Sequence, residues 1–275
     1  MKMKTQSIIL FILLLFLSAC SPFVIAGSSG VLPTPDIELL LATQGLVETP
    51  GQIDFEGVSF VLDPEVAANP IGSTIPENPG SPDGPYWEVH PQYISISLYG
   101  YPVQGSLFKP VISVYPVDDY RKLSSRAGET LDRLQDFLTQ KPADVHQVPS
   151  LPVMNHGQIF HTNLKFLDFQ NGVGVRFLAV YSQAVDPVTN QDLVYVFQGL
   201  TDDGRYAVSI FLPANHPTLP VDPNALTPEE MEAMVQDHGK YQVDTANSLS
   251  AQPATSFTPN LEKLDALVAS LKVEP

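Results

Sequence analysis

The sequence predicts an α+β protein in which an antiparallel sheet of about six to seven strands is built on two hairpins and flanked by helices on both faces. Three observations favour this α/β/α sandwich. Asn171-Gly172 and Asp203-Gly204 each separate two apolar runs, and both dipeptides are typical of tight hairpin turns. The strands of the second hairpin are apolar on both sides, so both sides need cover. Amphipathic helical patterns before and after the hairpins can supply that cover.

Three strands and a long loop are expected before the first helix. Residues 58–62 form a short apolar run, and residues 93–99 alternate Tyr and Ser with Ile and Leu, the period of a strand with one buried face. A third strand is expected over 111–117, broken by Pro116. Residues 64–91 hold seven prolines, which lack a backbone donor and fix φ, so this segment is predicted to be a loop.

A helix and the two hairpins follow. Leu131, Leu134 and Leu138 recur at helical spacing, which predicts an amphipathic helix over 129–140. A two-residue type I′ turn at Asn171-Gly172 would pair residues 164–170 with 173–183 and place Phe166 opposite Phe177. The turn at Asp203-Gly204 pairs residues 193–202 with 205–212, which places Phe197 opposite Ile210 and Tyr195 opposite Leu212.

Two helical segments close the chain. Thr227-Pro228-Glu229-Glu230 has the pattern of a capping box, and the helix it opens is expected to present Met231, Met234 and Val235 and to run toward Leu249. Thr258-Pro259 opens the last helix. Its predicted inward-facing residues are Leu261, Leu264, Leu267, Val268 and Leu271.

This order of elements, with a final helix of the form Leu-x-x-Leu-x-x-Ser-Leu at 264–271, resembles the PsbP/Mog1-like group of α/β/α sandwich domains over residues 55–272. The resemblance implies an accessory or binding protein, because known members of that group share no active site. No functional residue of that group has a matching motif in this chain.

The first twenty residues predict export. Lys2 and Lys4 precede an apolar run from Ile8 to Leu17, which is the pattern of a signal peptide over residues 1–19. As a helix this run would reach roughly 15 Å, half of the roughly 30 Å hydrocarbon core, so it is too short to span a bilayer.

The run ends in Leu17-Ser18-Ala19-Cys20, which resembles the lipobox of bacterial lipoproteins. The resemblance implies that Leu17, Ser18 and Ala19 are recognised by the signal peptidase, that cleavage occurs before Cys20, and that the Cys20 thiol carries a diacylglyceryl group. Residues 20–52 would then be a lipidated tether, and residues 53–275 a single domain anchored on the extracytoplasmic face of a membrane. The alternative is an ordinary secretory signal with an incidental cysteine.

Net charge and cysteine content limit the kinds of partner and cofactor that the chain can bind. The chain has 30 acidic and 14 basic residues and a net charge of −16, which disfavours nucleic acid because binding to phosphate backbones depends on Lys and Arg. Cys20 is the single cysteine, so an internal disulfide and a thiolate metal cluster are both excluded. The expected partners are the membrane, through the lipid, and an envelope protein or a small ligand; no cofactor is expected beyond the covalent lipid.

Catalytic and metal motifs are absent. The sequence lacks Gly-x-Ser-x-Gly, His-Glu-x-x-His and the common phosphate-binding patterns, so no catalytic residue is assigned. His156 and His161 have a poor spacing for paired metal ligands, and Asp186, Asn190 and Asp192 match no calcium loop, so no metal site is predicted.

The candidate binding residues are Tyr86, Trp87 and His90, at the end of the proline-rich segment. Exposed aromatic side chains on loops supply large contact areas for partners. The alternative is that Trp87 holds the loop against the core. We therefore expect a binding or accessory module; the alternative is a cell-envelope hydrolase whose catalytic residues meet only in the folded protein.

Overall fold

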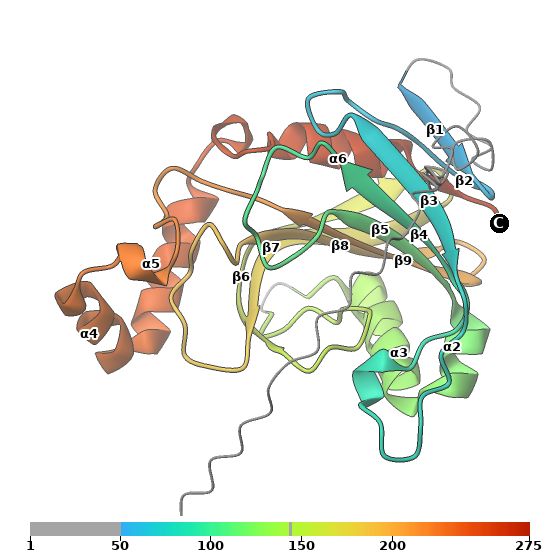
Figure 1. Ribbon diagram of the computed structural model, residues 1–275, viewed down its shortest axis with the longest axis horizontal. Coiled ribbons are helices and arrows are strands. Elements are labelled where there is room, and N and C mark those ends of the chain that lie inside the picture. The colour runs from blue at the N-terminus through green and yellow to red at the C-terminus, as the bar shows by residue number, and fades with distance from the viewer. Residues whose placement is uncertain (1–50, 143–144) are drawn as a thin grey trace, which may run out of the picture. The chain divides into compact units, whose positions relative to one another are not determined.

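The computed structural model describes residues 51–142 and 145–275, which belong to one compact unit (Figure 1). The predicted signal peptide, Cys20 and the tether as far as residue 50 lie outside the described residues. Among the described residues, none of the helices combines the length and the hydropathy needed to cross a bilayer.

Two antiparallel sheets form the framework. The larger sheet has seven strands in the order β3-β4-β5-β9-β8-β7-β6 and the smaller sheet has the order β1-β2-β10. The strands of the larger sheet are β3 (Asn69–Ile75), β4 (Tyr93–Tyr99), β5 (Val111–Pro116), β6 (Gly157–Phe169), β7 (Gly172–Ser182), β8 (Val194–Thr201) and β9 (Tyr206–Pro213). Those of the smaller sheet are β1 (Gln52–Phe55), β2 (Val58–Val61) and β10 (Lys272–Val273).

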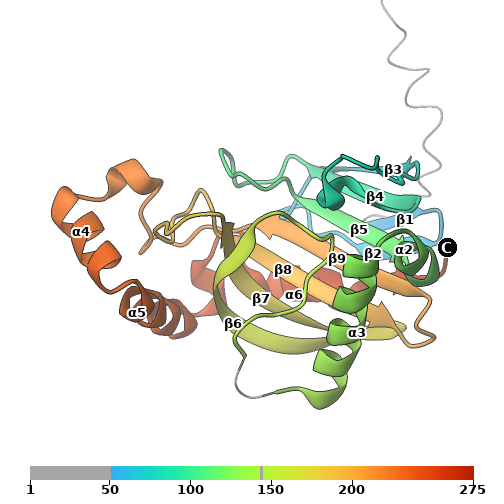
Figure 2. The same ribbon diagram turned by 90° about the horizontal axis from the view of Figure 1, so that it is seen from below.

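Helices cover both faces of the larger sheet, as predicted. The helices are α2 (Val117–Leu123), α3 (Ser125–Gln140), α4 (Pro228–Gln236), α5 (His238–Ser250) and α6 (Leu261–Ser270). Figure 2 shows α3 on one face of the sheet and α6 on the other. The two faces have separate apolar cores, one with α6 and the smaller sheet and the other with α2 and α3. The fold is therefore the predicted α+β sandwich.

The second hairpin has the predicted register, although β8 ends at Thr201 and β9 begins at Tyr206, so four residues rather than two lie between the strands. Phe197 lies opposite Ile210 and Tyr195 opposite Leu212, and Gly204 has a φ of +69° in the turn. Strand β8 is buried along its whole length because its two sides belong to different cores. β8 and β9 are accordingly interior strands of the sheet.

The predicted register of the first hairpin was wrong. Phe166 lies opposite Val175 rather than Phe177, because Phe169 pairs with Gly172 and the turn falls one residue earlier. The Asn171 side chain is used elsewhere: its Nδ2 donates to the Val273 carbonyl over 2.8 Å, and its Oδ1 accepts from Val273 N–H over 3.0 Å. A Cβ on Gly172 would lie 2.2 Å from the Phe169 ring, so glycine is needed there for close packing.

The predicted loop over 64–91 was also wrong in part. Strand β3 lies inside it and pairs with β4, with Pro70 opposite Leu98. β3 is the edge of the sheet, where one side of the strand has no ladder partner and proline is tolerated.

The helix expected from Thr227 toward Leu249 is two helices. Both hydrogen bonds of the capping box are present: Glu230 Oε2 accepts from Thr227 N–H over 2.8 Å, and Thr227 Oγ1 accepts from Glu230 N–H over 3.2 Å. The helix ends at Gln236, because Asp237 caps the next helix by accepting from Lys240 N–H over 3.1 Å. Of the expected apolar face only Met234 is buried, and Val235 is 59% exposed.

The last helix begins at Leu261, three residues after Thr258, because Asn260 Oδ1 caps it by accepting from Glu262 N–H over 2.8 Å. The predicted inward-facing residues are all buried, as expected: Leu261, Leu264, Leu267, Val268 and Leu271.

Candidate functional site

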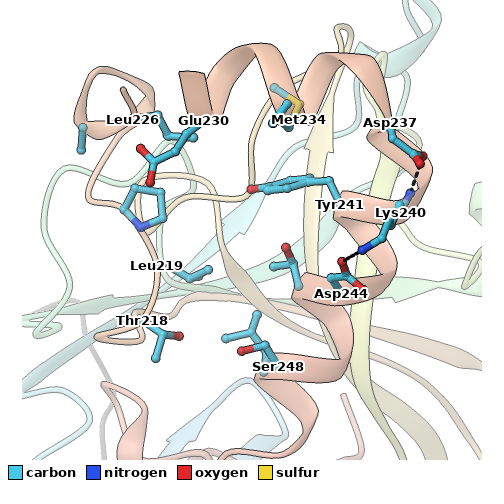
Figure 3. A pocket seen from close by; sticks show the side chains of 15 residues that line it. Thr218, Leu219, Leu226, Glu230, Met234, Asp237, Lys240, Tyr241, Asp244 and Ser248 are labelled. Carbon is cyan, nitrogen blue, oxygen red and sulfur yellow. Dashed lines mark hydrogen bonds and ion pairs between the residues drawn. The ribbon is translucent and has the colours of Figure 1, made fainter. Parts of the chain in front are cut away.

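A cavity of about 740 Å³ lies between α4, α5 and the loop over 218–226 (Figure 3). Its volume is within the range of about 300–1,000 Å³ that is typical of small-molecule sites. Figure 1 shows that α4 lies away from the larger sheet, with α5 between them. The cavity is therefore bounded by a helical hairpin and one loop rather than by the sheet.

Helical periodicity explains which residues of α4 line the cavity. Glu230, Ala233 and Met234 have the spacing i, i+3, i+4, which places them on one face of α4. Asp237, which follows α4 and caps α5, adds a second carboxylate at the far end of the apolar pair. Figure 3 shows Glu230, Met234 and Asp237 along the upper edge of the cavity and Tyr241 projecting across it from α5.

The interior of the cavity is largely apolar. Met234 and Leu249 are buried, and Leu219, Leu226 and Tyr241 are partly buried. The Tyr241 hydroxyl accepts from Val188 N–H over 2.9 Å, which fixes the ring in place. The cavity thus offers an apolar surface and one aromatic ring to a ligand.

Charged side chains form the rim. Three carboxylates, of Glu230, Asp237 and Asp244, accompany the Lys240 ammonium, which pairs with Asp244. Hydrogen bonding from Thr227 holds the pKa of Glu230 below its usual range, and the hydrogen bond to Asp244 raises the pKa of Lys240. Both shifts favour the charged form, so Glu230 is an anion and Lys240 a cation at neutral pH.

The loop that forms the opposite wall is held by Asn190 and His216. Asn190 Nδ2 donates to the carbonyls of His216 and Leu219, both over 3.1 Å, and its Oδ1 accepts from His216 N–H over 2.8 Å. Thr218 and Leu219 of this loop line the cavity. Asn190, which belongs to the acidic loop that matches no calcium-binding motif, therefore positions the wall of the cavity.

The His216 imidazole is 3% exposed, and its neighbours define its tautomer. Ser256 Oγ donates to the Pro253 carbonyl over 2.7 Å, so it accepts from His216 Nε2–H over 2.9 Å. Nδ1 then accepts from the Thr218 hydroxyl over 2.7 Å. In a catalytic serine–histidine pair the imidazole accepts the proton of the serine hydroxyl. Here His216 donates to Ser256 instead, so the hydrogen bond is reversed and the pair is structural: it holds the loop in place.

Acidification should destabilise the domain. Burial lowers the pKa of His216 in the folded protein, and burial likewise lowers the pKa of His161. Since an unfolded imidazole has a pKa of about 6.5, the unfolded state binds more protons just below that pH. The stabilisation is present above about pH 6.5 and is lost as the pH falls through the folded pKa values.

Urea midpoints measured at about pH 7.5 and about pH 5.5 check this expectation. His216→Asn, which cannot titrate, should show a smaller loss between the two pH values than the unsubstituted chain. An equal loss in the variant would contradict the role of His216.

The predicted binding residues lie outside this cavity. Tyr86 and Trp87 belong to a 3₁₀ helix, Tyr86–Glu88, none of whose residues is buried, and Trp87 is 41% exposed. The two rings are in edge contact at 5.0 Å, and the Arg126 guanidinium lies 4.4 Å from the centre of the Tyr86 ring. Trp87 is therefore partly exposed at the surface and is available for contact with a partner.

His90 does not join this aromatic pair. Its ring packs edge-on against Tyr93 at 5.1 Å, and its Nδ1 lies 3.0 Å from the Pro91 carbonyl. Of the three predicted binding residues, the structure brings together Tyr86 and Trp87.

The acidic loop before β8 is internally bonded. Asp192 Oδ2 accepts from the Thr189 hydroxyl over 2.6 Å, and Asp186 accepts from the Ser182 hydroxyl. Over residues 51–142 and 145–275, no group of three or more His, Cys, Asp or Glu side chains could hold a metal ion.

The cavity residues were missed by sequence reasoning. The pattern Glu-x-x-Ala-Met-x-x-Asp over 230–237 was a signal for a face with carboxylates at both ends, and Asp237 before His238-Gly239 was a signal for a helix break. The expected apolar face consisted of Met231, Met234 and Val235; of these Met234 lines the cavity, and Val235 faces solvent.

Comparison with protein-family models, curated proteins and solved structures found no match to this chain.

Proposed function

We propose that this chain is a lipid-anchored extracytoplasmic binding protein that takes a small ligand into the cavity between α4 and α5 and acts as an accessory module of the cell envelope. The observation that carries the proposal is the preformed cavity, whose size, apolar interior and few charged groups are typical of ligand sites.

The packing of α4 supports a ligand in this place. Met234 is the one buried residue of α4, although helices of this length usually bury a whole apolar stripe. Leu226 and Tyr241 on the facing elements are partly buried. A bound apolar group would cover this surface and contribute about 25 cal/mol for each Å² of apolar area removed from water.

The anchor supports the proposed location. Two acyl chains on Cys20 would supply on the order of 20 kcal/mol of gross transfer free energy, at about 0.8 kcal/mol per methylene, which is enough for stable membrane attachment. A binding domain tethered in this way would be retained at the membrane beside its partners.

Replacing Cys20 with serine should abolish the lipid anchor. Cells grown with radiolabelled palmitate should label the unsubstituted protein in the membrane fraction and leave Cys20→Ser unlabelled. Ser18→Thr, which keeps the cysteine, is the control and should still be labelled. Equal labelling of Cys20→Ser would contradict the anchor.

Filling the cavity should abolish binding of an apolar probe. The probe is N-phenyl-1-naphthylamine, whose fluorescence rises in apolar surroundings, added to residues 21–275, which contain the whole compact unit. Ala233→Trp places an indole on the cavity face of α4 and should weaken probe binding by at least about tenfold, which is 1.4 kcal/mol.

The matched control is Val235→Trp on the same helix, because Val235 is exposed and does not line the cavity. It should bind the probe as the unsubstituted domain does. Equal losses in both variants, or no binding by the unsubstituted domain, would contradict a ligand site in this cavity.

A further inference from the structure

We infer that the ligand of the α4–α5 cavity is a small amphipathic cation, with an apolar body against Leu219, Met234 and Leu249 and a positively charged group held at one end by Glu230 or Asp237. This inference rests on the proposed function, because it specifies the ligand of the same site.

The rim of the cavity carries more negative than positive charge. Lys240 is neutralised by Asp244, so its ammonium is already paired. Glu230 and Asp237 accept hydrogen bonds from backbone N–H groups of Thr227 and Lys240, and neither forms an ion pair within the described residues. The rim therefore carries three carboxylates against one ammonium, and a cationic ligand would complement this excess of negative charge.

The carboxylates of Glu230 and Asp237 lie on either side of an apolar surface. Glu230 lies on the cavity face of α4 and Asp237 directly follows the last residue of that helix, so the two are roughly 10 Å apart along its axis, with Ala233 and Met234 between them. If the positive group of the ligand binds either carboxylate, the apolar part of the ligand can lie against Ala233 and Met234 between them. Figure 3 shows Glu230 and Asp237 at opposite ends of the cavity.

The cavity also contains an aromatic ring, that of Tyr241. Tyr241 projects across the cavity between the two carboxylates (Figure 3), and its hydroxyl is held by Val188. The face of a fixed phenol ring attracts cations. An anionic amphiphile would instead meet three carboxylates and a lysine that is already paired.

Displacement of the fluorescent probe by three ligands with the same apolar chain tests the inference. The ligands are octylamine, octanol and octanoate, which at neutral pH are cationic, neutral and anionic, added to residues 21–275. Octylamine should displace N-phenyl-1-naphthylamine at a concentration at least about tenfold lower than octanoate, with octanol between them.

A double variant locates the preference. Glu230→Gln with Asp237→Asn removes both charges but keeps side chains that can cap their helices, so the fold should persist. It should bind the probe normally, while the difference between octylamine and octanoate falls to about twofold or less. The control, Glu229→Gln with Glu232→Gln, makes the same change of net charge on α4 outside the cavity and should keep the full preference.

The outcomes separate the two proposals. Equal or better displacement by octanol or octanoate, or equal loss of preference in both double variants, would overturn the cationic ligand and leave the cavity as a binding site. Failure of the probe to bind the unsubstituted domain would overturn the binding site itself, and the inference with it.

Discussion

Replacing Asp265 with alanine should lower the free energy of unfolding by about 3–5 kcal/mol, because the change leaves a buried arginine without its counter-charge. Asp265 lies on the inner side of α6. Its Oδ1 accepts from the Tyr195 hydroxyl over 2.9 Å and from Arg176 Nε–H over 3.1 Å, and its Oδ2 lies 2.9 Å from Lys165 Nζ. One carboxylate thus joins α6 to three strands of the sheet.

The burial of these groups is the reason for the large effect. Arg176 is 8% exposed, so the guanidinium could not recover its lost interaction from water. Tyr195 is fully buried, and burial, followed by the nearby Asp265 charge, raises its pKa well above the usual range. The hydroxyl therefore stays protonated and would lose its acceptor as well.

Urea denaturation followed by circular dichroism measures the effect. Asp132→Ala is the matched control, because Asp132 pairs with Arg121 at the surface and its side chain is 67% exposed. An exposed pair contributes about 0–1 kcal/mol, so the control should change stability little. A loss for Asp265→Ala as small as that of the control would contradict this account.

Gln198→Leu should lower the free energy of unfolding by about 2–3 kcal/mol, because an unsatisfied buried donor costs about 1–3 kcal/mol and further hydrogen bonds are lost with it. Gln198 is completely buried in β8. Its Oε1 accepts from Leu151 N–H over 2.9 Å, and its Nε2 donates to the Leu151 carbonyl and to Ser209 Oγ, both over 3.0 Å.

These bonds hold the segment around Leu151 on the sheet, where Leu151 is fully buried in the core with α2 and α3. The control is Gln135→Leu on the exposed side of α3, which should change stability by no more than about 0.5 kcal/mol. Urea midpoints of the two variants decide the matter: a Gln198→Leu domain as stable as the control would show that the segment is held without this side chain.

The two hairpins show what local sequence could predict. The register at Asp203-Gly204 was predicted correctly because Gly204 supplies the positive φ that the turn uses. The register at Asn171-Gly172 was predicted wrongly because Asn171 bonds to Val273, about a hundred residues later in the chain. Both dipeptides favour a tight turn, but at Asn171-Gly172 the contact with Val273 overrode this local preference.

Edge position explains the other error in the fold. The prolines between residues 64 and 91 argue against an interior strand, and β3 is a strand only because it lies at the edge of the sheet. Which strand occupies an edge depends on the pairing of all seven, and no short window of sequence contains that information.

The candidate site was predicted poorly for a related reason. Tyr86 and Trp87 are exposed and in contact, as a binding surface requires, but the cavity lies elsewhere. It is formed by two helices whose separation at Asp237 was not predicted, and by a loop that Asn190 and His216 hold in place.

By itself the sequence determined the α+β class, the cover on both faces of the sheet and the second hairpin, because apolar periodicity and turn chemistry act between neighbouring residues. From its first twenty residues it also predicts a lipid anchor, which remains a prediction. The register of the first hairpin, the edge strand, the buried Asp265 cluster and the cavity arise on folding, since each depends on contacts between residues far apart in the chain.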